Sequence, residues 1–385
     1  MIPYGKQSIS QEDINAVINV LKSDFLTQGP KVPLFEKVVS EYCKVNYAVS
    51  TNSATSALHL ACLALSLSPG DWLWTTPITF VASANCGLYC GAQIDFVDID
   101  PETYNMSIDS LKHKLLDAEI HGKLPKVIIP VHFSGQSCDM RAIYALSKKY
   151  GFKIIEDASH AIGGKYHNIN IGSCKYSDIT VFSFHPVKII TTGEGGMAMT
   201  NDEKLASKMR RLSSHGITRI SDQMSHLPDG PWYYQQIDLG FNYRMTDIQA
   251  ALGVSQMNRI DNYINKRQNI AAHYNKELSE LPIITPHQHV DNFSSCHLYV
   301  IRLQCKFLKK NHAQIFQSLR DEGIGGNLHY IPVHTQPYYK NLGFSEGDFP
   351  HAELYYQEAI SLPIYPTLDK YQQNSVISSL KKILQ

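Results

Sequence analysis

The strongest constraint on the fold is a regular alternation, between residues 47 and 200, of short apolar runs with longer amphipathic stretches. The stretches at 53–66, 107–118 and 140–150 have the spacing of amphipathic helices. Alternating strands and helices are typical of an α/β fold with a mainly parallel sheet, whose ligands bind at the carboxyl ends of the strands. The expected strands span residues 47–50, 72–75, 93–97, 126–131, 153–156, 178–184 and 196–200.

The pattern changes after Asn242. Thr246 and Gln249 have the spacing of a capping box, and a helical pattern continues from there towards Leu281. This helix is expected to link a large domain, residues 1–255, to a smaller C-terminal α/β domain, residues 256–385. In the smaller domain we expect strands at 297–303 and 327–330 and helices at 311–322 and 371–384.

The composition excludes several classes of partner. Lys plus Arg and Asp plus Glu both number 35, so no global basic field favours nucleic acid or a membrane surface. The eight cysteines are scattered without a CxxC pair, which indicates reduced thiols in a cytoplasmic protein. The first six residues lack a signal-peptide pattern, and the apolar stretch 55–67 is too short to span a bilayer.

Lys188 is the main candidate for catalysis. It follows the expected strand 178–184 in the segment SFHPVK (183–188), and the glycine-rich segment TTGEGG (191–196) comes directly after it. A lysine on a rigid strand end can form an imine with an aldehyde cofactor if its amine is often neutral, and glycines allow a ligand to approach the backbone. Taken alone, Lys188 is better explained as a surface lysine before a hairpin turn.

A second candidate segment is IIEDASH (154–160), an apolar strand that ends in acidic residues. Pyridoxal phosphate (PLP) needs a carboxylate beside its pyridine nitrogen, which keeps the ring protonated as an electron sink. Asp157 is well placed for this role, and His160 could bond the phenolic oxygen of the cofactor. The structural alternatives are a helix N-cap for Asp157 and a core histidine for His160.

A third segment, TNSATSAL (51–58), places small and hydroxyl residues between a strand and a helix. The free amides and the dipole of a helix N-terminus form a phosphate cradle, to which Ser183 could add a hydroxyl. Phe80, after the strand 72–75, could stack on a pyridine ring. Plain N-capping and core packing explain each feature alone, but their order along the chain, together with Asp157 and Lys188, predicts a PLP site.

These segments resemble the DegT-type sugar aminotransferases, PLP enzymes with the aspartate-aminotransferase fold (fold type I). The resemblance covers nearly the whole chain. The motifs that carry it are LTQGP (26–30), NSATSAL (52–58), VHFSGQ (131–136), EDASHA (156–161), SFHPVK (183–188), GFNYRMTDIQ (240–249), NLHYIPVH (327–334) and SLP (361–363).

The resemblance implies a role for each matching position. Lys188 would anchor PLP as a Schiff base and carry protons, Asp157 would pair with the pyridinium nitrogen, and His160 would approach the ring oxygen. Asn242 would reach the phosphate from the partner subunit of a homodimer with shared active sites, and no metal is implied. The other implied contacts are Ala54, Thr55, Phe80 and Ser183 for the cofactor, and Tyr4, Asp24, Phe25, Leu26, Thr27, His329, Tyr330, Ile331 and Pro332 for the nucleotide sugar.

Within the family, the segments NSAT (52–55), TPITFVA (76–82) and SH (159–160) are similar to the subfamily of pseudaminic acid biosynthesis. That similarity implies amination at C4 of a UDP-linked 4-keto-6-deoxy sugar with L-glutamate as donor. Alternatives are a dTDP- or UDP-linked 4-keto or 3-keto sugar of another pathway, or a non-catalytic protein that binds PLP or a sugar nucleotide. A sugar dehydratase would have histidine at position 188, and the 17 histidines lack the spacing of a metal hydrolase.

Overall fold

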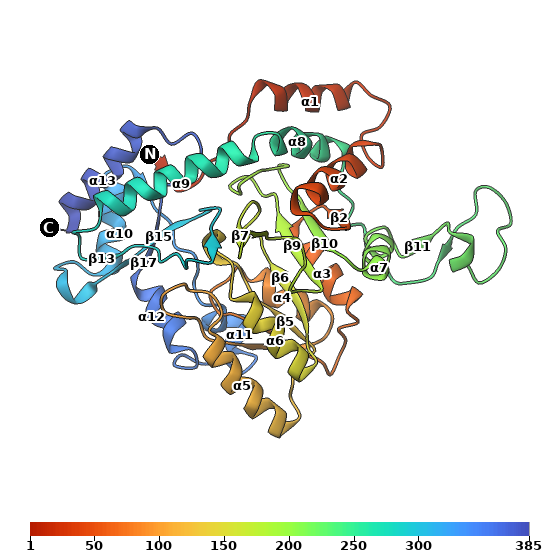
Figure 1. Ribbon diagram of the computed structural model, residues 1–385, viewed down its shortest axis with the longest axis horizontal. Coiled ribbons are helices and arrows are strands. Elements are labelled where there is room, and N and C mark those ends of the chain that lie inside the picture. The colour runs from red at the N-terminus through yellow and green to blue at the C-terminus, as the bar shows by residue number, and fades with distance from the viewer. Residues whose placement is uncertain (385) are drawn as a thin grey trace.

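A seven-stranded sheet forms the centre of the computed structural model, which describes residues 1–384 (Figure 1). The strand order is β2-β10-β9-β6-β5-β3-β4, and only β10 runs antiparallel to its neighbours. The α/β prediction is therefore confirmed, and β5 shows the largest departure from the expected bounds. The strands are β2 (Tyr47–Thr51), β3 (Trp72–Thr75), β4 (Gln93–Phe96), β5 (Val127–Ile129), β6 (Lys153–Asp157), β9 (Ile179–Ser183) and β10 (Gly196–Thr200).

Helices cover both faces of this sheet, which explains its continuous apolar strands. Alternate residues of β3 point to opposite faces: Leu73 packs in the cluster that contains Leu58 of α3, and Trp74 packs with Leu111 of α5. The helices of this region are α1 (Gln11–Leu21), α2 (Lys31–Cys43), α3 (Ala54–Ala64), α4 (Ala82–Tyr89), α5 (Ile108–His121), α6 (Met140–Tyr150) and α7 (Glu203–Ser213).

A hairpin projects from the body beside α7, at the end of the molecule opposite both termini (Figure 1). It contains β11 (Ile217–Thr218) and β12 (Gln235–Gln236), which pair antiparallel. A second small sheet, in the order β14-β7-β8, joins Asn292–Phe293 to Lys165–Tyr166 and Ile169–Asn170.

The helical segment after the capping box at Thr246 is two helices rather than one. Here α8 spans Asp247–Met257, α9 spans Ile260–Glu277, and the chain turns at Asn258 and Arg259. The Arg259 guanidinium reaches across to the Asp13 carboxylate, 2.5 Å away, which ties this turn to α1. Figure 1 shows α9 continuing from α8 towards the C-terminal elements.

The C-terminal elements include a sheet in the order β13-β15-β17, and β1 pairs with β16. The expected strand at 327–330 is wrong, because only Asn327 bridges to Ser361 before the chain leaves the sheet. The division at residue 255 stays a prediction. The remaining elements are β1 (Ile2–Pro3), β13 (Ile283–Ile284), β15 (Tyr299–Leu303), β16 (Ile324–Gly325), β17 (Ala359–Leu362), α10 (His312–Asp321), α11 (Pro337–Lys340), α12 (Pro350–Glu358) and α13 (Lys370–Leu384).

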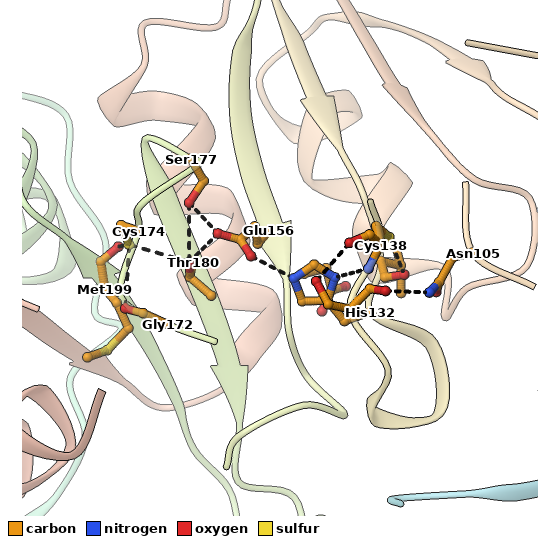
Figure 2. Close-up of polar contacts among 12 residues, drawn as sticks. Asn105, His132, Cys138, Glu156, Gly172, Cys174, Ser177, Thr180 and Met199 are labelled. Carbon is orange, nitrogen blue, oxygen red and sulfur yellow. Dashed lines mark hydrogen bonds and ion pairs between the residues drawn. The ribbon is translucent and has the colours of Figure 1, made fainter. Parts of the chain in front are cut away.

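A buried polar network ties three central strands together (Figure 2). The Glu156 carboxylate of β6 accepts hydrogen bonds from His132 Nε2 at 2.6 Å, from Thr180 Oγ1 at 3.0 Å and from Ser177. The Cys138 amide donates to His132 Nδ1 at 3.2 Å, so the imidazole proton is on Nε2. Although burial disfavours the charge, these hydrogen bonds hold the pKa of Glu156 below its usual value.

We predict that Glu156→Gln lowers the free energy of unfolding by about 3 kcal/mol, because it removes the buried charge that three hydrogen-bond donors share. Urea denaturation followed by circular dichroism measures the change. The exposed Glu203→Gln is the control, with an expected effect within about 0.5 kcal/mol. Equal effects of the two changes would contradict the role of the network.

This stabilisation has a defined pH dependence. Because the folded pKa of Glu156 lies below the unfolded value, the contribution is complete above the unfolded pKa and is lost as pH falls through the folded pKa. The stability difference between wild type and Glu156→Gln should therefore shrink as the pH falls below about 5.

Candidate active site

Three segments meet at the edge of the sheet where the parallel strands end. Gly196 of β10 is opposite Thr51 of β2 on one side and Ser183 of β9 on the other. Asp157, the last residue of β6, is opposite Val181 of the adjacent β9. The phosphate-cradle segment, Ser183 and Asp157 are therefore brought to one edge of the sheet, as predicted.

A ligand can approach the backbone amides in the first turn of α3. Ser53 caps the helix by accepting a hydrogen bond from the Ser56 amide at 3.2 Å. Since Ala54 and Thr55 are in the first turn, their amides have no acceptor within the helix. A Cβ at Gly196 would lie only 2.5 Å from the Ala54 nitrogen, so glycine is required beside this turn.

Asp157 is held rigidly in a buried position. Its Oδ2 accepts a hydrogen bond from Ser83 Oγ at 2.6 Å, and its Oδ1 accepts one from the Ser159 amide at 3.0 Å. Ser83 is in turn 2.8 Å from Thr79 Oγ1. Sequence reasoning missed Ser83 and Thr79; the only available signal was their position on either side of Phe80.

The Lys188 residue is half-buried, and the Asp157 charge acts on its amine. Burial lowers the pKa of the Lys188 amine to about 8, although the Asp157 charge opposes this shift. A substantial fraction of the amine is therefore neutral near physiological pH. Imine formation requires this neutral form, so the environment of Lys188 matches the predicted role.

Residues expected at the cofactor and at the nucleotide sugar lie together. The Tyr330 hydroxyl is 3.1 Å from His160 Nε2, and the Tyr330 ring lies 6.2 Å from that of Phe80. The ring of Tyr4, which follows β1, is 5.0 Å from the His329 ring. The pairing of β1 with β16 therefore brings the N-terminal segment to this cluster.

Burial and the nearby Lys188 charge lower the pKa of His329 to about 3. His329 Nδ1 lies 2.8 Å from Ser361 Oγ. His329 is therefore neutral, and its position is fixed by β17.

The other candidate residues are placed differently. The segment 24–27 is exposed and contacts the start of α8 through a bridge between Thr27 and Thr246. Asn242 is exposed, and its carbonyl oxygen is 3.5 Å from Asn52 Nδ2 of the same chain, just before α3. Ile331 is exposed and Pro332 is buried. No described contact in this chain joins the segment 24–27 to Lys188 or His160.

The residues at this edge fit PLP. The open first turn of α3 suits a phosphate, the anchored Asp157 suits a pyridinium nitrogen, and Lys188 supplies a partly neutral amine. His160 Nδ1 is buried without a hydrogen-bond partner among residues 1–384, as expected of a group that awaits a ligand. The fold and the site together define a PLP-dependent enzyme of fold type I.

Comparisons with known proteins specify the family. Residues 7–381 match the DegT/DnrJ/EryC1/StrS aminotransferase family, to which the chain belongs. The spore coat polysaccharide biosynthesis protein SpsC of Bacillus subtilis is 40% identical over 100% of this chain and 97% of its own length. The UDP-4-amino-4,6-dideoxy-N-acetyl-beta-L-altrosamine transaminase of Campylobacter jejuni is 38% identical, over 100% of this chain and 98% of its own.

A solved structure agrees with this assignment. Helicobacter pylori PseC, an aminotransferase involved in the biosynthesis of pseudoaminic acid, superposes with a TM-score of 0.90 at 32% identity, covering 100% of this chain and 99% of its own. The chain is therefore a PLP-dependent sugar aminotransferase, as the sequence indicated. In the described part of the chain, residues 1–384, no helix is both long and apolar enough to cross a membrane.

We predict that the cofactor-free enzyme captures PLP covalently at a rate that rises with pH and levels off above about pH 8, because only the neutral Lys188 amine attacks the aldehyde. Stopped-flow absorbance of the bound cofactor measures this rate. Lys188→Arg, which stays charged, should show no covalent capture at any pH. A rate independent of pH between 6 and about 9 would contradict the lowered pKa.

Proposed function

We propose that this enzyme transfers an amino group from L-glutamate to C4 of a UDP-linked 4-keto-6-deoxy sugar in pseudaminic acid biosynthesis. The proposed acceptor is UDP-2-acetamido-2,6-dideoxy-β-L-arabino-hex-4-ulose. The observation that carries this proposal is the full-length similarity to the Campylobacter jejuni altrosamine transaminase. The pair Ser159-His160, with its bond to Tyr330, agrees with the subfamily resemblance.

Lys188 moves the protons in this mechanism. When bound, PLP supplies an electron sink for the carbanion that forms at the reacting carbon. The neutral Lys188 Nζ removes the proton from the α-carbon of glutamate, and in the second half-reaction it delivers a proton to C4 of the sugar. A pKa of about 8 suits a group that acts as base and then as acid near neutral pH.

The surrounding residues hold and orient the reactants. Asp157, fixed by Ser83, stabilises the protonated pyridine nitrogen, and Phe80 covers one face of the ring. The cofactor phosphate binds at the first turn of α3, at Ala54 and Thr55, with the hydroxyl of Ser183.

The nucleotide sugar is proposed to bind on the side of Tyr4 and Tyr330. Energy from binding the uridine diphosphate positions C4 near Lys188 Nζ. The proposed sugar-nucleotide contacts are Tyr4, Asp24, Phe25, Leu26, Thr27, His329, Tyr330, Ile331 and Pro332.

We also propose a cytoplasmic homodimer with shared active sites. The projecting hairpin exposes large apolar side chains, with Leu227 at 84%, Trp232 at 72% and Leu239 at 82% exposure, which a partner subunit would cover. Asn242 follows this hairpin and is itself exposed, so it is available to the cofactor phosphate of a partner. The eight cysteines are unpaired, as in proteins of reducing compartments.

A second candidate substrate has specific support. SpsC of Bacillus subtilis, at 40% identity, is named for spore coat polysaccharide biosynthesis, which favours a dTDP- or UDP-linked 4-keto or 3-keto sugar of another pathway. A non-catalytic binding protein is disfavoured by the lowered pKa of Lys188.

The substrate is tested by offering UDP- and dTDP-linked 4-keto-6-deoxy sugars with glutamate. We expect 2-oxoglutarate and a UDP-linked 4-amino sugar, identified by mass and by NMR at C4. Lys188→Arg should form neither product and serves as the control. Amination of only a dTDP-linked sugar would overturn the pseudaminic acid assignment and leave the family assignment intact.

The shared site is tested by complementation between two impaired chains, Lys188→Ala and Asn242→Ala. If Asn242 serves the partner's site, a mixed dimer contains one site with both native residues, and activity returns on co-expression. If Asn242 serves its own chain, each site of the mixed dimer lacks one residue and no activity returns. Sedimentation of each variant confirms that its oligomeric state is unchanged.

A further inference from the structure

The mechanism above leaves a buried histidine unused beside the site. His297 precedes β15, and its ring centroid is 4.4 Å from that of His160. His160 is 4% exposed and His297 is 3% exposed. They come from segments far apart in the chain, so sequence reasoning did not connect them.

Both rings have an unused nitrogen. Nδ1 of His160 and Nδ1 of His297 are buried, and neither has a hydrogen-bond partner among residues 1–384. Leaving a buried polar group unpaired costs about 1–3 kcal/mol, so two adjacent cases favour one ligand atom that both nitrogens can reach. Phenylalanine at either position would give a packed ring without this cost.

The charges around the pair keep both rings neutral. Burial, followed by the Lys188 charge, lowers the pKa of His160. Burial, together with the positive charges of Lys188 and Arg267, lowers the pKa of His297. The Lys188 charge therefore acts on both imidazoles.

The proton of His160 can be assigned from its contacts. The Tyr330 hydroxyl has His160 Nε2 as its only hydrogen-bond partner in the described chain, residues 1–384, at 3.1 Å. With the Tyr330 hydroxyl as the donor to Nε2, the His160 proton is on Nδ1. The free nitrogen of His160 is thus a hydrogen-bond donor.

The backbone of His297 is fixed on both sides. Its amide donates to the Ser134 carbonyl at 2.9 Å, and its carbonyl accepts from Arg267 Nη1 at 3.1 Å. Arg267 is buried, and no carboxylate pairs with it within residues 1–384. Its Nη1 donates to the main-chain carbonyls of Cys296, His297 and Ile364, so the cation serves to hold this segment in place.

We propose that His160 and His297 together form a two-imidazole contact for one oxygen of the bound cofactor, which makes His297 a further cofactor-binding residue. The phenolic oxygen of PLP is the matching group, because it is anionic and accepts two hydrogen bonds. This inference rests on the placement of His160 at the cofactor, and it is independent of the sugar substrate.

The test uses the PLP-loaded enzyme without any sugar, and follows the absorbance of the bound cofactor against pH. A donor to the phenolic oxygen stabilises the deprotonated cofactor, so its loss raises the midpoint. We expect His297→Phe to raise the midpoint by about one pH unit, and His160→Phe to act in the same direction. His297→Asn, whose amide nitrogen replaces Nδ1, should restore the wild-type midpoint.

Thermal unfolding of the cofactor-free chain provides a second readout. His297→Phe removes an unpaired buried nitrogen, so the cofactor-free chain should unfold at the same or a higher temperature than wild type. A purely structural histidine would instead show a lower unfolding temperature and no change in the cofactor midpoint.

The outcomes test the cofactor role of His297 separately from that of His160. The role of His297 is overturned if the midpoint is unchanged in His297→Phe, or if it shifts equally in His297→Phe and His297→Asn. In either case, a shifted midpoint in His160→Phe would leave the cofactor role of His160 standing. An unchanged midpoint in His160→Phe overturns the cofactor role of His160 and this inference with it. Neither result affects the proposed sugar substrate, which is tested by the product screen.

Discussion

The burial of ionisable groups at the carboxyl edge of the sheet is the constraint on which the active site depends. Desolvation lowers the pKa of Lys188 to about 8, which makes a lysine useful as a nucleophile and proton carrier. The same burial would penalise the Asp157 carboxylate, and hydrogen bonds from Ser83 and the Ser159 amide compensate for it. Helices on both sheet faces provide the low-dielectric surroundings that both residues need.

A second polar layer supports this edge within the sheet. Glu156 and Asp157 are adjacent in β6 and therefore point to opposite faces of the sheet. Asp157 faces the cofactor side, whereas Glu156 enters the network with His132 and Thr180 on the other face (Figure 2). The main-chain amide of His132 also donates to the Asp157 carbonyl at 3.0 Å, so a backbone hydrogen bond links the Glu156 network to Asp157. The network thereby restricts movement of the strand that presents Asp157.

The C-terminal elements complete the site rather than only covering it. Tyr330 bonds His160, His329 is fixed by Ser361 of β17, and His297 packs against His160. The departure of the chain from the sheet after Asn327 allows this arrangement, because a continued strand would hold the next residues in the ladder. The wrong strand prediction at 327–330 thus falls on a segment of the candidate site, where tertiary contacts override local preference.

The sequence by itself determined the alternating α/β order, all seven central strands and the candidate cofactor residues that follow them, because strand periodicity and the chemistry at strand ends are local properties. Family motifs added the expected roles of Lys188, Asp157 and His160. Only the tertiary structure decided which distant groups support these residues: Ser83 contacts Asp157, and His297 lies beside His160. It also decided the turn at Arg259 that divides α8 from α9, where Arg259 pairs with Asp13. Such contacts join segments far apart in the chain, and no local pattern encodes them, because they arise only when packing brings buried polar groups within hydrogen-bond distance.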